Sequence, residues 1–204
     1  MSKKPQPHKA GQIRIIGGQW RGRKLPVPDS PGLRPTTDRV RETLFNWLAP
    51  VLYDAKCLDC FAGSGALGFE ALSRYAGETV LLEAEKSIAQ QLQKNLALLN
   101  SGKGQVVHTN ALNWLAQPGN AFNVVFLDPP FRCGLLPDTI ALLEKQGWLA
   151  DEAWIYLEAE TEHSNLDVPT NWRLHREKTA GQVAYRLYHR QSLSVLEQQE
   201  DDDA

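Results

Sequence analysis

Apolar residues along this chain occur in two kinds of pattern that alternate with each other. Short continuous apolar runs, which are typical of buried strands, occur at residues 56–61, 79–83, 105–109, 122–127 and 153–158. The segments between them have helical spacing, most clearly at residues 86–99, where Ile88, Leu92, Leu96 and Leu99 form one apolar stripe. Strands that alternate with helices predict a parallel sheet covered on both faces, with ligand sites at the carboxyl ends of its strands.

The N-terminal part of the chain has a different pattern. Residues 12–27 contain two strand-like runs around Gly17 and Gly18, which predicts a β-hairpin whose tight turn uses the positive φ that glycine tolerates. A helix is expected to follow, with Thr37 or Asp38 as its N-cap. This helix would lead into the sheet.

The C-terminal part and the chain length complete the predicted organisation. Residues 172–190 predict two strands joined near Gly181, a hairpin that would add an antiparallel member to the sheet. At 204 residues the chain suits one α/β domain. We expect a mobile N-terminus at 1–10, a single domain at 11–190 that includes a basic hairpin extension at 11–37, and an acidic disordered tail at 191–204.

Composition narrows the cellular context. The sequence has no run of about 18 apolar residues, so it predicts no membrane span. No apolar segment typical of a secretory signal follows the charged start. The three cysteines are too few and too unevenly placed for a disulfide framework. We therefore expect a cytoplasmic protein without a membrane partner.

The charge of the chain is polarised. Residues 1–50 hold ten Lys/Arg against three Asp/Glu, whereas the rest of the chain holds 12 against 21. A basic end on an acidic body is typical of a focused nucleic-acid footprint, because phosphate contacts need local clusters of Lys and Arg. An ordinary solvated basic face fits the same charge pattern equally well.

A glycine-rich turn follows the first predicted strand of the sheet, in the segment LDCFAGSGALGFEAL. Gly63, Gly65 and Gly68 would let a ligand approach the backbone at the N-terminus of a helix. This spacing, with Glu83 at the end of the next strand, also fits a nicotinamide dinucleotide site, so a dehydrogenase stays open. Asp59 favours S-adenosylmethionine, because a carboxylate would repel a pyrophosphate and attract the cationic methionine end of that cofactor. Alternatively, Asp59 caps the turn.

A second motif, FNVVFLDPPF, joins a buried strand to Asp128, Pro129, Pro130 and Phe131. Successive prolines hold the backbone extended and remove N–H donors, which leaves carbonyl acceptors. An exocyclic amine has two hydrogens, which the Asp128 carboxylate and the Pro129 carbonyl would accept while Phe131 stacks on an extruded base. An Asp-Pro turn that merely ends a strand is the alternative, but the position of this motif after a glycine-rich unit favours a base-amine site.

With the segment RPTTDRVRETLFNWL at residues 34–48, these motifs make the chain resemble the bacterial 16S rRNA guanine-N2 methyltransferases of the RsmD type, over residues 14–190. The resemblance implies a Rossmann-like class I methyltransferase of the α/β class, with a seven-stranded, mostly parallel sheet, an antiparallel last strand and an N-terminal β-hairpin. It implies S-adenosyl-L-methionine as the cofactor. The implied target is the N2 amine of a guanine in 16S rRNA. From the polarised charge we further expect the substrate to be the small ribosomal subunit or 30S particle rather than free RNA, and we expect the protein to be a monomer.

The resemblance also implies roles for individual residues. The cofactor-binding set is Asp59, Phe61, Ala62, Gly63 and Gly65 at the methionine part, Glu83 at the ribose hydroxyls, Asn110 with Ala111 at the adenine, and Thr37 with Arg39 closing the pocket. The catalytic, target-base set is Asp128, Pro129, Pro130 and Phe131. From the charge pattern rather than from the resemblance, we expect the RNA-binding set to be Arg14, Arg21, Arg23, Lys24 and Arg132. Many relatives carry aspartate at the position of Asn110, and asparagine offers the same acceptor oxygen without charge.

Other patterns in the chain predict no further chemistry. Cys57 and Cys60 form a C-x-x-C pair inside a predicted buried strand, which favours core packing over a redox or zinc role. The five histidines have no metal-ligand spacing, so we expect neither a metal nor a histidine-activated nucleophile. Three alternatives stay open: a DNA adenine-N6 methyltransferase, which shares the D-P-P-F motif, an NAD-dependent dehydrogenase, and a non-catalytic ribosome-assembly factor, which the intact D-P-P-F motif disfavours.

Overall fold

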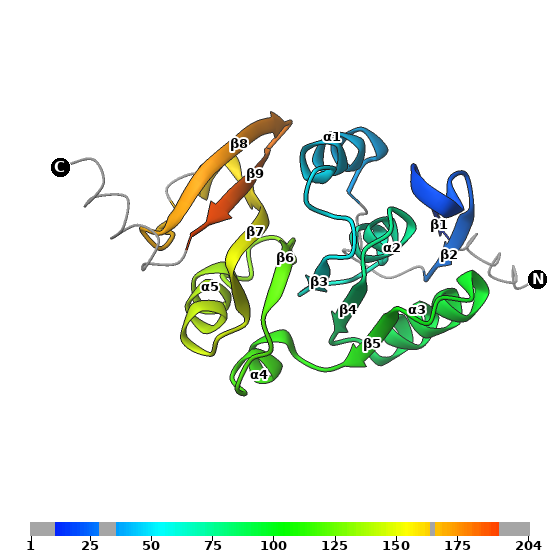
Figure 1. Cartoon of the computed structure of the whole chain (residues 1–204). Helices are drawn as coiled ribbons and strands as arrows, with labels where there is room; N and C mark the ends of the chain where they lie inside the picture. The colour runs from blue at the N-terminus through cyan, green and yellow to red at the C-terminus, as the bar shows by residue number, and fades with distance from the viewer. Residues whose placement is uncertain (1–10, 29–35, 164–165, 192–204) are drawn as a thin grey trace, which may run out of the picture.

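The computed structural model describes residues 11–28, 36–163 and 166–191. These residues form a seven-stranded sheet flanked by helices, with a separate two-stranded hairpin at one side (Figure 1). The predicted mobile N-terminus at 1–10 lies outside the described residues, as do residues 192–204 of the predicted tail and Arg34 of the RPTTDRVRE segment.

The elements follow the alternation expected from the apolar pattern. The strands are β1 Gly11–Arg14, β2 Lys24–Val27, β3 Lys56–Asp59, β4 Glu78–Glu83, β5 Gly104–His108, β6 Phe122–Leu127, β7 Leu149–Glu160, β8 Trp172–Ala180 and β9 Val183–Arg190. The helices are α1 Asp38–Leu48, α2 Ala66–Ser73, α3 Lys86–Leu99, α4 Ala111–Leu115 and α5 Leu136–Lys145, with short 3-10 turns η1 Gly18–Trp20 and η2 Thr161–His163. Each strand predicted from an apolar run is present, and α3 has the predicted bounds.

The strands of the large sheet lie in the order β5-β4-β3-β6-β7-β9-β8. Strands β3 to β7 pair in parallel, whereas β9 is antiparallel to both of its neighbours, β7 and β8. This confirms the predicted mostly parallel sheet with an antiparallel last strand. The carboxyl ends of β3, β4, β6 and β7 therefore meet at one edge of the sheet.

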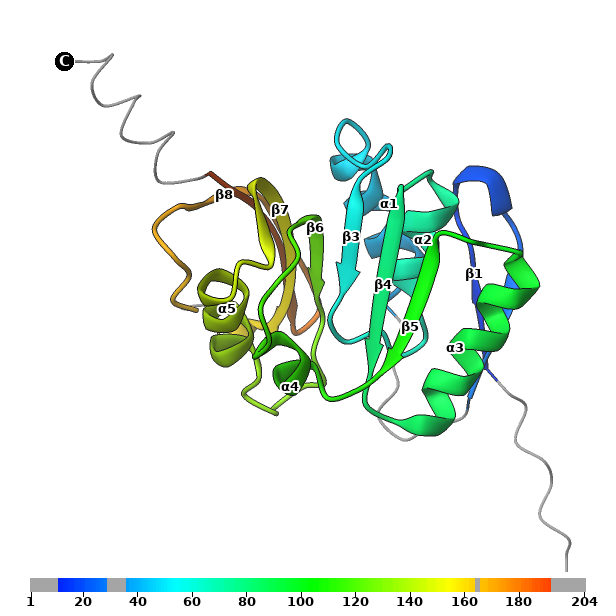
Figure 2. The same cartoon turned by 60° about the horizontal axis from the view of Figure 1, so that its bottom comes forward.

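Helices cover both faces of the sheet (Figures 1 and 2). On one face, α1, α2 and α3 pack on strand residues such as Cys57, Leu81 and Phe126. On the other face, α4 and α5 pack on Leu58 and Val125, the strand residues that point the opposite way. Burial on both faces explains why the strands are continuous apolar runs rather than alternating ones.

The N-terminal hairpin is present, but the predicted tight turn at Gly17 and Gly18 is wrong. Residues 15–23 connect the two strands and include η1. The connection is long because it docks on the C-terminal end of α2, where the Gly17 N–H donates to Glu70 Oε1 at 2.8 Å. Gly18 has a φ of +75°, and a Cβ at this position would overlap the Ser73 carbonyl, so the close approach to α2 requires glycine.

A buried pair of charged residues joins the hairpin to α1 and α2. Glu70 on α2 is fully buried, and it accepts hydrogen bonds from two backbone N–H groups of the hairpin connection and from Arg74 Nε, each at 2.8 Å. Arg41 on α1, also buried, lies 3.7 Å from Glu70 and donates to the carbonyl oxygen of Arg14 at 2.9 Å. A buried charge is tolerated only where it is paired and hydrogen-bonded, so Glu70 is a structural carboxylate.

We predict that Glu70→Ala lowers the free energy of unfolding by about 3 to 5 kcal/mol, because the substitution leaves Arg41 and two backbone donors buried without this partner. Glu70→Gln should be less harmful, since it keeps an acceptor oxygen. Equilibrium unfolding in urea measures both variants. Glu42→Ala on the exposed face of α1 is the matched control and should change the value by no more than about 0.5 kcal/mol. A Glu70→Ala effect no larger than this control would mean that the carboxylate does not anchor the hairpin.

Candidate functional site

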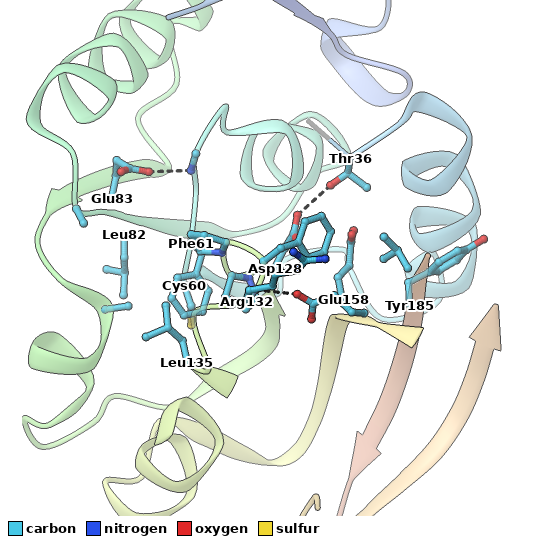
Figure 3. A pocket seen from close by; sticks show the side chains of 18 of the residues that line it. Thr36, Cys60, Phe61, Leu82, Glu83, Asp128, Arg132, Leu135, Glu158 and Tyr185 are labelled. Carbon is cyan, nitrogen blue, oxygen red and sulfur yellow. Dashed lines mark hydrogen bonds between the residues drawn. The ribbon is translucent and has the colours of Figure 1, made fainter. Parts of the chain in front are cut away.

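A large cavity of about 870 Å³ opens at the carboxyl ends of the parallel strands, a volume typical of cofactor and substrate sites. Its walls come from the ends of β3, β4, β6 and β7, from the start of α1 and from the turn between β8 and β9 (Figure 3). The predicted site residues that line it are Thr37, Phe61, Gly63, Glu83, Asn110, Ala111, Asp128, Pro129, Pro130, Phe131 and Arg132. The predicted site residues away from its lining are Asp59, Ala62, Gly65, Arg39, Arg14, Arg21, Arg23 and Lys24. The sheet thus brings the glycine-rich turn and the D-P-P-F motif to one cavity.

Glu83 at the end of β4 is fixed by the glycine-rich turn. Its Oε2 accepts from the Gly63 N–H at 2.9 Å (Figure 3). Its Oε1 accepts from the Glu85 N–H at 2.8 Å. Gly63 has a φ of +49°, the left-handed region that glycine adopts without strain. A carboxylate has about four lone-pair sites, so Glu83 can still accept hydrogen bonds from a ligand in the cavity.

Asp59, at the end of β3, points into the protein instead of lining the cavity. Its Oδ2 accepts from the Gly68 N–H in the first turn of α2 at 3.1 Å, which agrees with the alternative that it caps the turn. Burial raises the pKa of Asp59 to about 7 and the charge of Glu83 adds to this, while backbone N–H groups of Gly68 and Phe61 lower it.

Gly65 is required for packing rather than for ligand contact. It has a φ of +77° as the N-cap of α2, and a Cβ there would overlap the ring of Phe69. Ala62 is buried, and its N–H donates to the Leu82 carbonyl at 2.9 Å. These two residues shape the turn, whereas Phe61 and Gly63 reach the cavity.

Asn110 stands where the chain leaves β5 and is the N-cap of α4. Its Oδ1 accepts from the Asn113 N–H at 3.2 Å, and Ala111 beside it is buried. The side-chain oxygen that is predicted to bind the cofactor adenine therefore already accepts one hydrogen bond within the protein. Its second lone pair stays available for the adenine amine.

The D-P-P-F motif follows β6 and meets two polar residues that the sequence analysis missed. The Thr36 hydroxyl donates to Asp128 Oδ2 at 3.2 Å. β6 and β7 pair with Leu127 opposite Leu157, so Asp128, directly after β6, lies beside Glu158 near the end of β7. Glu158 ends a predicted strand, a signal that was present in the sequence, but strand order and register were needed to recognise it.

The two neighbouring carboxyl groups perturb each other. Burial raises the pKa of Asp128 well above its ordinary value, the charge of Glu158 raises it further, and the hydrogen bond from Thr36 lowers it. Burial also raises the pKa of Glu158, against hydrogen bonds from Tyr156 and Thr36 that favour its ionised form. The two acids can therefore accept hydrogen bonds from a ligand, and the ionisation of their carboxyl groups depends on which ligand binds.

The loop after Asp128 forms the rim of the cavity. Phe131 is 45% exposed, which leaves its ring accessible to a flat ligand. Arg132 has a φ of +60°, and its N–H donates to Glu160 Oε1 at 2.7 Å, which ties the loop to the end of β7. Non-glycine residues with positive φ are uncommon and cluster at functional sites.

The N-terminal segment contributes unequally to the cavity. Thr37 lines it and caps α1 by accepting from the Val40 N–H at 3.4 Å, whereas Arg39 is exposed on α1 away from the lining. Thr37 as N-cap confirms the sequence expectation.

The basic residues of the hairpin lie away from the cavity, since the β1–β2 connection is at the edge where the strands begin (Figure 2). Two of them have structural partners: Arg14 pairs with Asp38 at 2.8 Å, and Arg23 donates to the Leu98 carbonyl near the end of α3 at 3.1 Å. Arg21 and Lys24 are exposed. All four basic residues of the hairpin are exposed and thus form a surface separate from the cavity, whereas Arg132, the fifth member of the predicted RNA-binding set, lines the cavity.

Other groups fall outside the site. Cys57 and Cys60 are buried, which agrees with core packing, and burial raises the pKa of Cys57 to about 12. Among the described residues, no three His, Cys, Asp or Glu side chains gather closely enough to hold a metal ion. In the same residues, no helix has both the length and the apolar character needed to cross a membrane.

Comparison with known proteins agrees with this geometry. The family model "Conserved hypothetical protein 95" matches residues 13–189. The chain is 69% identical over 190 residues to "Ribosomal RNA small subunit methyltransferase D" of Escherichia coli (strain K12), with 93% of this chain and 96% of that protein covered. The protein of the same name in Haemophilus influenzae is 53% identical over 192 residues, with 92% and 99% covered. The solved structure of Escherichia coli yhhF is 68% identical with a TM-score of 0.85, over 89% of this chain and 99% of that one. The chain therefore has the class I methyltransferase fold and belongs to the conserved hypothetical protein 95 family, the family of ribosomal RNA small subunit methyltransferase D.

Proposed function

We propose that this protein transfers a methyl group from S-adenosylmethionine to the exocyclic N2 amine of a guanine in small-subunit ribosomal RNA. The observation that carries the proposal is the single cavity with Asp128 and Phe131 at one end and Glu83 at the other. A methyl donor and an amine must meet at one point, and a shared cavity satisfies this requirement. The two bacterial relatives are named for methyl transfer to the RNA of the small ribosomal subunit, which supports the substrate class.

S-Adenosylmethionine fits the end of the cavity at the glycine-rich turn. The fixed Glu83 carboxylate would accept hydrogen bonds from the ribose hydroxyls, and Asn110 would accept from the adenine amine. Phe61 and Gly63 would border the methionine part. When bound, this cofactor supplies an electrophilic methyl group on a cationic sulfonium.

A nicotinamide dinucleotide fits the same turn less well. A pyrophosphate binds to free backbone N–H groups at the start of a helix. Here the Gly63 N–H donates to Glu83 at 2.9 Å, and the Gly65 N–H donates to the Ala62 carbonyl at 2.7 Å. The Glu83 carboxylate at this position would also repel a pyrophosphate. The methyl donor is therefore the better match.

On the target side, the residues of this chain would orient the amine. The Asp128 carboxylate and the Pro129 carbonyl would accept its two hydrogens, which aims the nitrogen lone pair at the methyl carbon. The nitrogen–carbon bond forms as the carbon–sulfur bond breaks, and the electron pair of that bond stays on a neutral thioether. The methylated amine is cationic and gives one proton to Asp128 or to water. Phe131 would stack on the base.

The charge pattern supports a ribosomal particle as the substrate. Arg132 lies at the cavity rim, and Arg21 and Lys24 are exposed on the distant hairpin, so phosphate contacts at both places would span an extended RNA surface. The acidic remainder of the chain would repel free RNA elsewhere. We propose a cytoplasmic monomer that acts on the 30S particle.

The first test is transfer of label from methyl-labelled S-adenosylmethionine. The acceptors are small ribosomal subunits from a strain without the corresponding methyltransferase, free 16S rRNA, DNA and protein, and the products are identified as nucleosides. We expect N2-methylguanosine from the ribosomal particle. N6-Methyladenine in DNA would instead favour the DNA enzyme, and RNA binding without any label transfer would favour an assembly factor.

The second test concerns the cofactor. Calorimetry should detect binding of S-adenosylmethionine and none of NAD. Glu83→Ala should weaken that binding about 10- to 150-fold, because a hydrogen bond to a charged group contributes about 1.5 to 3 kcal/mol. Glu85→Ala, which removes the neighbouring exposed carboxylate at the N-cap of α3, is the control and should bind nearly as the wild type does. Tight NAD binding without S-adenosylmethionine binding would overturn the proposal.

The third test separates hydrogen-bond acceptance from base catalysis at Asp128. Asp128→Asn keeps an acceptor oxygen and should retain some transfer, whereas Asp128→Ala should slow it by about 10- to 150-fold or more. Because the pKa of Asp128 is raised, the wild-type rate should increase as the pH rises through that pKa and the carboxyl ionises. In Asp128→Asn only Glu158 of the pair still titrates, so the pH dependence should change. The measurement is single-turnover transfer at saturating cofactor, and equal, complete inactivity of two folded variants would favour an obligatory carboxylate base.

A further inference from the structure

Two acids stand side by side at the base-binding end of the cavity. Leu127 and Leu157 are partners in the β6–β7 ladder, so the residues that follow them are neighbours: Asp128 comes directly after β6, and Glu158 lies in β7, two residues before its end. Both side chains line the cavity (Figure 3). Adjacent strands are about 4.8 Å apart, so one flat ligand can reach both carboxyl groups.

Glu158 is held in a defined position. The Tyr156 hydroxyl donates to its Oε1 at 2.6 Å, and Tyr156 is itself fully buried in the core under α1. Thr36, which donates to Asp128 at 3.2 Å, also lies within hydrogen-bonding reach of Glu158. Each ionised carboxylate has about four lone-pair sites, so both acids keep the capacity to accept from a ligand.

The proposed transfer step gives Asp128 a role and leaves Glu158 without one. The two hydrogens of the target amine are accepted by Asp128 and the Pro129 carbonyl. A second carboxylate, only 7% exposed and anchored by a buried tyrosine, costs folding free energy because its charge is desolvated. That cost is explained if Glu158 meets a donor on the bound base.

The bases differ in the ring atom next to the exocyclic amine. In guanine, the N2 amine and the ring nitrogen N1 are bonded to the same carbon, and N1 carries a hydrogen that points in nearly the same direction as one amine hydrogen. In adenine and cytosine, the ring nitrogen beside the amine has a lone pair and no hydrogen. A carboxylate at this position accepts from guanine, whereas it repels the lone pair of adenine or cytosine.

We propose that Glu158 accepts the N1–H of the target guanine while Asp128 accepts from its N2 amine, so that Glu158 selects guanine over the other amine-bearing bases. The inference rests on the proposed guanine-N2 methyl transfer and names the residue that reads the base. Tyr156 and Thr36 are positioning residues for the two carboxylates. The mutual repulsion of Asp128 and Glu158 is offset when two N–H donors of one base bind to them.

The test compares guanine with 2-aminopurine at the methylated position of reconstituted small ribosomal subunits. 2-Aminopurine keeps the amine at the same carbon, but its N1 has a lone pair in place of a hydrogen. In single-turnover transfer, the wild-type protein should prefer guanine by about 100-fold or more, since a site built for a donor rejects an analogue that lacks it. Glu158→Gln should slow transfer to guanine about 10- to 150-fold, because a charged acceptor is lost.

The same variant should not slow transfer to 2-aminopurine, because the glutamine amide can turn an N–H group toward N1. The guanine preference should therefore fall by about tenfold or more. Tyr156→Phe, which removes the 2.6 Å hydrogen bond and keeps the ring, should lower the preference by a smaller factor. Glu152→Gln on the same strand is the matched control: its exposed carboxylate pairs with His189 at the start of β7, and both rates should stay unchanged.

The outcomes separate this inference from the proposed function. Equal slowing of both bases by Glu158→Gln would assign Glu158 a purely structural role and overturn the inference, while guanine methylation by the wild-type protein would still support the proposed function. A wild-type protein that methylates no guanine would refute both. Binding of S-adenosylmethionine to each variant, measured by calorimetry, should stay within about twofold of the wild type. The reason is that none of the three substituted residues lies at the Glu83 end of the cavity.

Discussion

The parallel pairing of β6 with β7 determines what the rest of the site can do. Its register brings Asp128, directly after β6, beside Glu158, near the end of β7, and the hydrogen-bonded strands hold the two residues together. Because burial raises the pKa of both acids, they favour the folded state while protonated, and that contribution is lost as the pH rises through their raised pKa values. Thr36 and Tyr156 reduce this cost by donating to the ionised forms. The site thus combines a local loss of stability with a fixed arrangement of acceptors.

Features that depend on local sequence could be predicted well. The stripe of leucines in α3 marks its bounds because helical spacing is a property of consecutive residues, and Thr37 caps α1 because a hydroxyl before a helix satisfies a free N–H group. The D-P-P-F segment could likewise be placed at the end of a buried strand, since two prolines cannot continue a sheet. The strand-ending position of Asp128 therefore followed from its neighbours in the chain.

Features that depend on distant contacts could not be predicted in the same way. Glu158 joins the site only through the order and register of β6 and β7, and Thr36 only because the fold places its hydroxyl beside Asp128, 92 residues later in the chain. Gly17 and Gly18 suggested a tight turn, yet the binding partners of that segment, Glu70 and Ser73, lie more than fifty residues later in the chain. Asp59 shows the opposite limit, because its place in the first strand of the sheet was predicted correctly, whereas the contact of its side chain with Gly68 of α2 was not.

The antiparallel strand β9 completes the cavity, which gives a physical reason for this departure from a parallel sheet. β8 runs in the same direction as β7, so the turn at Gly181, with a φ of +62°, lies at the edge where the parallel strands end. β9 then starts at that edge and pairs Tyr185 with Glu158, and both residues line the cavity. If β9 were parallel to β7, the chain would first have to cross back from Gly181 to the opposite edge of the sheet, where the parallel strands begin. The hairpin of β8 and β9, with its two-residue turn, therefore forms a wall of the cavity beside the two acids. In this arrangement β9 lies on the side of Glu158 that faces away from Asp128.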